Sequence, residues 1–308
     1  MGGWVTALNV LVAILADSSY AMFVGALLAR WWLIRAGPLT HQPASDAITI
    51  SGLRLGRLVM ICLTVLIVSH LARPWFVASS MSGSTLFAET FALIPTILTS
   101  TRQGGLWYAN SLALGTLLGR RLFGGERIVT GALWIEVAGL CMLAATKAAS
   151  SHASEDGDFT LAEISQFLHN IATSVWAGAV LIAGLVVVPR LAVLDDASIL
   201  WNYGGRLSKT VTKALGILVI SGLYASWSDM HGAVSSLWSS PWGKTLVTKL
   251  AFVATAVLLG SLTRFRCLGR PATSQRATTM TKLLRSEAAV MMGVLCISGL
   301  LANTNPSG

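Results

Sequence analysis

Long apolar runs alternate with short polar stretches along the whole chain. Several runs exceed the roughly 18 residues that an α-helix needs to cross a bilayer. The pattern predicts about eight membrane-spanning helices, at 5–29, 55–78, 105–123, 128–149, 161–188, 210–228, 243–264 and 284–304. A further apolar run at 86–99 contains Glu89 and Pro95. We therefore expect a short surface or re-entrant helix there, with a ninth span as the alternative.

Composition supports a protein embedded in the lipid bilayer. Hydrophobic residues make up 54% of the chain and charged residues 11%, whereas a soluble domain carries about 25% charged residues. The fold class predicted is therefore an all-α membrane protein. The formal net charge of +9 raises the question of nucleic acid, but the basic residues recur between the apolar runs. We expect no nucleic-acid partner, because this spacing is typical of membrane topology.

The basic residues also predict how the chain is oriented. If both termini lie outside, the inner loops hold 17 of the 22 Lys and Arg residues. Basic residues concentrate on the cytoplasmic side of membrane proteins, so both termini are expected on the outer side. The exceptions left outside are Arg73, Arg102, Lys147, Lys244 and Lys249.

The two halves of the chain resemble one another at several places, with offsets of 151 to 153 residues for most of them. The matches are 68–75 with 220–227, Phe23–Gly25 with Trp176–Gly178, Glu136 with Glu287, and the segments before Gly104 and Gly243. Four spans per half is an even number, so the halves share one orientation. This predicts two parallel four-helix repeats, in domains 1–152 and 153–308. Coincidence among leucine-rich helices is the alternative.

Four of the five histidines fall on the outer side in this topology: His70, His152, His169 and His231. His70 lies near the outer end of the second span. His169 lies within the fifth, about 12–14 Å beyond the capping box Thr160-Leu-Ala-Glu163 that marks the start of that helix. A histidine inside a membrane indicates function by default. A simple hydrogen bond to a neighbouring helix is the alternative for each.

Soft donors accompany these histidines on the predicted outer side. Met230 and His231 are adjacent in the loop after the sixth span, and Met81 occupies the corresponding region of the first half. Thioether and imidazole groups suit copper, and sulfur favours Cu(I). The predicted metal ligands are therefore His169, His70, His231, Met230 and Met81, although an ordinary loop dipeptide also explains the Met-His pair.

Three acidic residues lie inside apolar runs, namely Asp17, Glu136 and Glu287. Ionisable groups within a membrane usually face the protein interior or a polar pathway. We expect these three to form a polar intramembrane pathway, with a proton-linked or ion-pairing role for the glutamates. Hydrogen bonding between helices is the alternative. No nucleophile elbow, P-loop, dinucleotide-binding glycine motif or H-E-x-x-H occurs in the sequence, so no enzymatic activity is expected.

The stretch from His169 to the end of the chain resembles the copper resistance protein D family. The resemblance rests on His169–Gly178, Arg206-Leu-Ser, Ser221–Tyr224, Ser239–Leu250, Leu284–Glu287 and Asn303–Pro306. The first half resembles the N-terminal region of full-length members more loosely. The sequence departs from the family pattern at Pro241-Trp242 and lacks a methionine-rich copper-loading segment.

The resemblance implies a multi-pass protein of the bacterial inner membrane that handles copper at the periplasmic side, with both termini periplasmic. It places His169 and Glu287 on motif positions and implies a small periplasmic copper-binding partner of the copper resistance C type. The expected function is transport of copper ions from periplasm to cytoplasm, contributing to copper homeostasis and resistance. The alternatives are a haem-binding redox protein using His70 and His169, and a non-transporting scaffold or copper sensor.

Overall fold

The computed structural model describes residues 3–34, 42–124, 130–151, 157, 159–194, 197–229, 238, 240–271 and 273–303. All regular structure within these ranges is helical, as predicted. The helices are α1 (Gly3–Ile34), α2 (Gln42–Ser82), α3 (Phe87–Ser100), α4 (Arg102–Phe123), α5 (Thr130–Ala149), α6 (Leu161–Ile182), η2 (Ala183–Val187), α7 (Val188–Leu191), α8 (Ala197–Asp229), α10 (Pro241–Thr263), η3 (Arg264–Leu268) and α11 (Ser274–Leu301).

Six stretches of the described chain are long and apolar enough to cross a membrane: Gly3–Leu33, Gly52–Ser82, Leu161–Leu191, Ser198–Trp227, Pro241–Leu268 and Ser274–Leu301. The chain is therefore a multi-pass membrane protein. The two remaining predicted spans coincide with α4 and α5. α4 carries arginines at both of its ends, and the side chains of α5 are described only from residue 133. The count of eight spans stays a prediction.

The apolar run at 86–99 folds into the short helix α3. Its 14 residues make a helix of about 21 Å, too short to cross a hydrocarbon core of about 30 Å. The Trp75 indole N–H donates to the Thr90 hydroxyl at 3.1 Å, which fixes α3 to the end of α2. α3 is the short helix expected from the sequence, and it does not form a ninth span.

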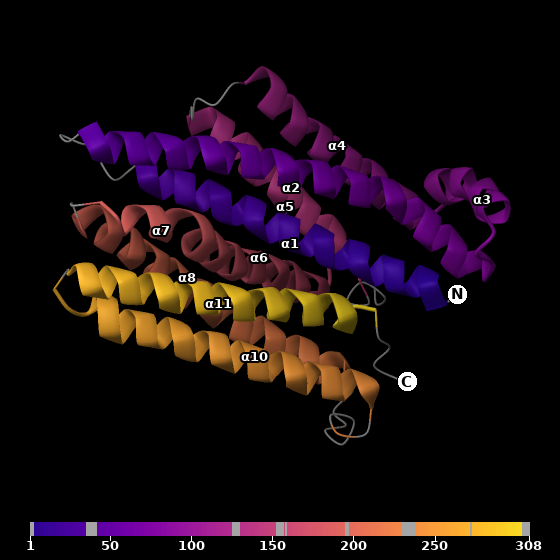
Figure 1. Ribbon diagram of the computed structural model, residues 1–308. Coiled ribbons are helices and arrows are strands. Elements are labelled where there is room, and N and C mark those ends of the chain that lie inside the picture. The colour runs from indigo at the N-terminus through magenta and orange to yellow at the C-terminus, as the bar shows by residue number, and fades with distance from the viewer. Residues whose placement is uncertain are drawn as a thin grey trace.

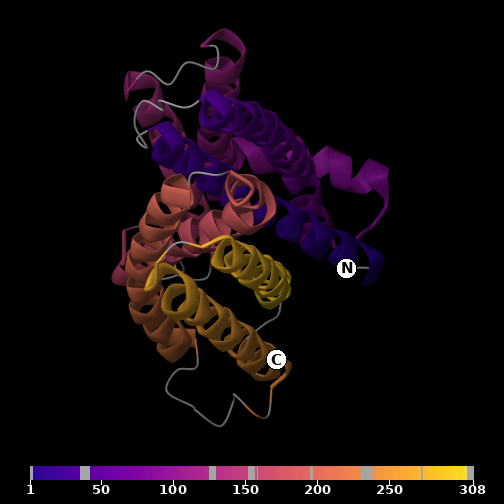
Figure 2. The same cartoon turned by 60° about the vertical axis from the view of Figure 1, so that its left-hand side comes forward.

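Helix α1 lies at the centre of the bundle, packed between α2 and α6 (Figure 1). Figures 1 and 2 show α2 to α5 on one side of the α1–α6 pair and α8, α10 and α11 on the other. α1 and α6 cross where Gly25 meets Gly178. A Cβ atom at Gly25 would lie 2.1 Å from the Gly178 carbonyl oxygen, and one at Gly178 would lie 1.8 Å from the Ala21 oxygen. The two backbones touch directly, which only small residues allow.

The start of α1 and the end of α11 lie at the same end of the bundle (Figure 1). The Asn9 amide donates to the Asn303 side-chain oxygen at 2.9 Å across these two helices. We call this end of the bundle the terminal end. It corresponds to the side that the charge pattern assigns to the periplasm.

Candidate functional site

A carboxylate on the central helix pairs with one lysine and interacts at longer range with two further basic residues. Asp17 of α1 forms an ion pair with Lys147 of α5, with the Nζ and Oδ1 atoms 2.5 Å apart. Arg73 of α2 and Lys249 of α10 lie within electrostatic range of the same carboxylate. We call these four residues the Asp17 cluster. With three cations and one anion, its formal charge is positive.

The positions of the basic residues in the sequence already point to this cluster. Arg73, Lys147 and Lys249 are three of the five basic residues that the positive-inside pattern leaves on the outer side. A basic residue that breaks this pattern inside an apolar run needs a partner, because an isolated charge in the membrane is costly. Asp17 supplies that partner for Lys147, so a pair with a neighbouring helix, the alternative to a polar pathway, is the role observed for Asp17.

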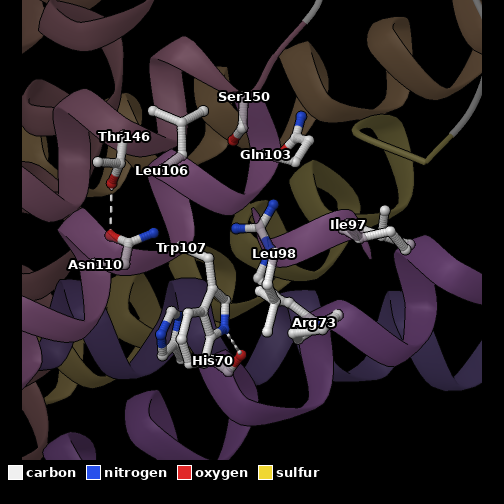
Figure 3. Close-up of a pocket in the computed structure, with 12 residues that line it drawn as sticks. His70, Arg73, Ile97, Leu98, Gln103, Leu106, Trp107, Asn110, Thr146 and Ser150 are labelled. Carbon is white, nitrogen blue, oxygen red and sulfur yellow. Dashed lines mark hydrogen bonds between the residues drawn. The ribbon is translucent and has the colours of Figure 1, made fainter. Parts of the chain in front are cut away.

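The His70 ring is fixed between α2 and α4. It stacks on Trp107 with ring centroids 4.9 Å apart, and the Trp107 indole N–H donates to the His70 carbonyl at 3.3 Å (Figure 3). Its Nε2 lies 2.9 Å from the Ser111 hydroxyl oxygen. The Ser111 hydroxyl is also placed to donate its one proton to the Trp107 carbonyl at 2.9 Å, an arrangement that favours Nε2 as the donor in the His70–Ser111 bond. The Nδ1 lone pair of His70 is then the one able to bind a ligand.

His169, in the second half of the chain, is also hydrogen-bonded to a serine of a neighbouring helix. Its Nδ1 lies 3.1 Å from the Ser221 hydroxyl oxygen on α8, and Ser221 donates its proton to the Ile217 carbonyl at 2.8 Å. This arrangement favours Nδ1 as the donor in the His169–Ser221 bond, which leaves the lone pair on Nε2. A second residue that fixes the tautomer in this way is typical of metal-binding histidines. Sequence analysis identified His169 but not Ser221.

A cavity lined by both apolar and polar side chains adjoins His70 between α2, α3, α4 and α5 (Figure 3). The Thr146 hydroxyl donates to the Asn110 side-chain oxygen at 2.5 Å on one wall. The other polar groups that line the cavity are His70, Arg73, Gln103, Trp107 and Ser150. Figure 3 shows the Arg73 guanidinium pointing into the cavity, so a cationic group faces the mainly apolar space beside His70.

The predicted metal ligands do not form one cluster within the described part of the chain. His70 and His169 stand on α2 and α6, and α1 lies between these helices (Figure 1). Met81, in the last turn of α2, is 65% exposed. The predicted ligands Met230 and His231 lie outside the described residues. Among those described, no three His, Cys, Asp or Glu side chains lie close enough together to hold a metal ion.

The two intramembrane glutamates are both buried but differ in their partners. Glu136 on α5 forms an ion pair with Arg121 of α4 at 2.8 Å. Of the roles expected for it, ion pairing is therefore the one observed. Glu287 on α11 is 2% exposed and lies against the backbone of Gly260 on α10. It makes no ion pair with any described residue.

Comparison with known proteins identifies the C-terminal part. Residues 201–301 match the family model described as Copper resistance protein D. This C-terminal third of the chain is therefore similar to the copper resistance protein D family. The match covers α8, α10 and α11 and begins after His169, so it is shorter than the resemblance that the sequence suggested.

One curated relative supports the same family. Copper transport protein CutJ of Bacillus subtilis (strain 168) is 26% identical over 162 residues, which cover 51% of this chain and 28% of that protein. The match thus spans little more than a quarter of the relative's length. No solved structure matches the chain.

Proposed function

We propose that this protein transports copper across the bacterial inner membrane, importing it from the periplasm to the cytoplasm. Such transport would contribute to copper homeostasis and resistance. The observation that carries the proposal is the family match at residues 201–301, which falls on three helices able to cross a membrane. The similarity to a protein named as a copper transporter supports it.

Copper is the cargo in this proposal, and His169 is its first ligand inside the bundle. The serine-fixed tautomer leaves Nε2 of His169 available. His70 offers Nδ1 in the first half, and Met81, Met230 and His231 would act as soft donors at the periplasmic mouth. A small periplasmic protein of the copper resistance C type would deliver the ion to this side.

Charge near His169 bears on how tightly the ion is held. Lys249 and Lys147 lie within electrostatic range of the imidazole, and both repel a bound cation. Asp17 offsets part of that repulsion through its contact with Lys147. The result is a weak cation site, and weak binding suits conduction because a transported ion must leave as well as enter.

The test is copper uptake by the full chain in proteoliposomes, together with metal analysis of the purified protein. His169→Ala should abolish uptake while membrane insertion is retained. Gln166→Ala, about one turn away on the same helix, is the matched control and should keep uptake. Uptake by the His169→Ala variant equal to that of the wild type would remove His169 from the route. Copper binding without uptake would favour a non-transporting sensor or scaffold.

A second candidate is a haem-binding membrane redox protein. The observation that favours it is the basic surroundings of both histidines, with Arg73 near His70 and Lys249 near His169. Cationic side chains suit the anionic propionates of haem, and histidine is a common axial ligand. A haem band in the visible spectrum that disappears in the His169→Ala variant, with no copper bound to the wild type, would establish this function instead.

A further inference from the structure

Helices α4 and α10 begin in the same way, which aligns the two halves in the structure. Thr101 caps α4 by accepting from the Gly104 N–H at 3.2 Å. Ser240 caps α10 by accepting from the Gly243 N–H at 2.9 Å. In each helix a hydroxyl residue is followed three positions later by the glycine whose amide it accepts. The two caps therefore define equivalent starting points.

Counted from these caps, Arg121 and Gly260 occupy equivalent positions. Each lies 20 residues after its cap. The buried positions agree with this alignment: Leu117 and Ala256, each 16 residues after its cap, are both completely buried. An arginine in the first half thus corresponds to a glycine in the second.

In the first half the arginine neutralises a buried carboxylate. The Arg121 and Glu136 side chains are 6% and 7% exposed, and their charged atoms are 2.8 Å apart. The Arg121 guanidinium also lies over the Phe23 ring, 5.7 Å from its centroid. Glu136 therefore has a permanent counter-charge supplied by the chain itself.

In the second half the corresponding carboxyl lacks this counter-charge. Glu287 packs on Gly260, where an added Cβ would lie 3.1 Å from its Oε1 atom. Trp176, at the position equivalent to Phe23, is 2% exposed and directs its indole toward Glu287. Its N–H is directed at the carboxyl as a hydrogen-bond donor, although the geometry is weaker than that of a normal hydrogen bond, so a neutral donor stands where the first half has a cation. The Trp176 indole N–H is therefore incompletely satisfied.

We propose that Glu287 is a proton-binding site at the centre of the second half, where a proton takes the role that Arg121 has in the first half. A buried carboxylate without a counter-charge is strongly unfavourable, so such a group holds a cation or a proton. A proton fits better than a metal ion, because Glu287 packs directly on the Gly260 backbone. No group of three His, Cys, Asp or Glu residues surrounds it within the described ranges.

The position of Glu287 suits a group that exchanges protons with both sides of a membrane. It lies near the middle of α11, with about 20 Å of helix on either side. α4 ends two residues after Arg121, whereas the helix that contains Gly260 continues to Leu268 through η3. Glu287 itself lies near the middle of α11, whereas Glu136 lies in the second turn of α5. A proton on Glu287 would therefore have to travel through the bundle to reach either surface.

The site can be tested without copper, so its outcome is separate from that of the transport proposal. The purified full-length protein is treated with dicyclohexylcarbodiimide, an apolar reagent that adds to protonated carboxyl groups in membranes. Peptide mass spectrometry then measures the adduct at each glutamate. We expect at least about tenfold more adduct at Glu287 than at Glu136, because an ion-paired carboxylate stays deprotonated. The adduct at Glu287 should decrease as the pH is raised.

Two variants act as controls. Glu287→Gln should stay folded, because glutamine imitates the neutral acid, and should lose the adduct. Arg121→Met should make Glu136 reactive by removing its counter-charge. If that variant does not fold, the comparison of the two glutamates in the wild-type protein still decides. Adduct at Glu136 equal to or above that at Glu287, no adduct at Glu287, or an adduct independent of pH would overturn the proposal.

Discussion

The contact between Gly25 and Gly178 should be highly sensitive to the addition of a single methyl group. In Gly25→Ala the new Cβ would lie 2.1 Å from the Gly178 carbonyl oxygen and 2.2 Å from its carbon. Both obstructing atoms belong to the backbone of α6, so no side chain can rotate away. The two helices must separate by about 1 Å to relieve the overlap, and inserting atoms into a packed core typically costs about 1–3 kcal/mol. We expect a loss at the upper end of that range.

The measurement is thermal denaturation in detergent micelles, followed by intrinsic tryptophan fluorescence. Gly216→Ala on α8 is the matched control, because no atom lies within 4 Å of the position of its added Cβ. Alanine exceeds glycine in helix propensity by about 1 kcal/mol, so this control should be as stable as the wild type or slightly more stable. If Gly25→Ala denatures at the same temperature as Gly216→Ala, the close crossing of α1 and α6 is wrong.

Two further predictions concern charge. Arg121→Met should destabilise the protein by about 3–5 kcal/mol, because it leaves the Glu136 carboxylate buried without its partner; adding Glu136→Gln should restore most of the loss, and thermal denaturation of the single and double variants checks this. A reporter that is active only in the periplasm should be active when it is fused after Gly308, because the distribution of basic residues predicts that this end lies outside. Cytoplasmic activity of that fusion would contradict the predicted orientation.

The helices themselves could be predicted because they depend on local properties of the sequence. Apolar runs interrupted by basic residues marked all eight long helical stretches, and Glu89 with Pro95 marked the short helix α3. The threonine half of the capping box also formed, because the Thr160 hydroxyl accepts from the Glu163 N–H at 3.2 Å. The Glu163 carboxylate accepts from the N–H of Phe159, one residue before the expected donor. These features need no knowledge of which helices become neighbours.

The partners of the polar residues could not be predicted in the same way, because they depend on helix packing. Asp17 and Lys147 are 130 residues apart, and nothing local relates one to the other. Ser221 is an ordinary helix serine until α8 packs against α6 and brings it to His169. The metal-ligand set that combines His169 with Met230 and His231 remains a prediction, since those two lie outside the described residues.

Paired and unpaired charges are distributed differently between the two predicted repeats. The ion pair between Arg121 and Glu136 joins helices of the first half, and so does the pair between Lys147 and Asp17. Among the described residues of the second half, Glu287 has no such partner. Paired groups give a stable arrangement, whereas an unpaired buried carboxyl can change its state of protonation at lower cost. The match to the copper resistance D family includes Glu287. If Glu287 binds a proton as proposed, the second half is the part whose charge state can change, and the first half is the part whose buried charges stay paired.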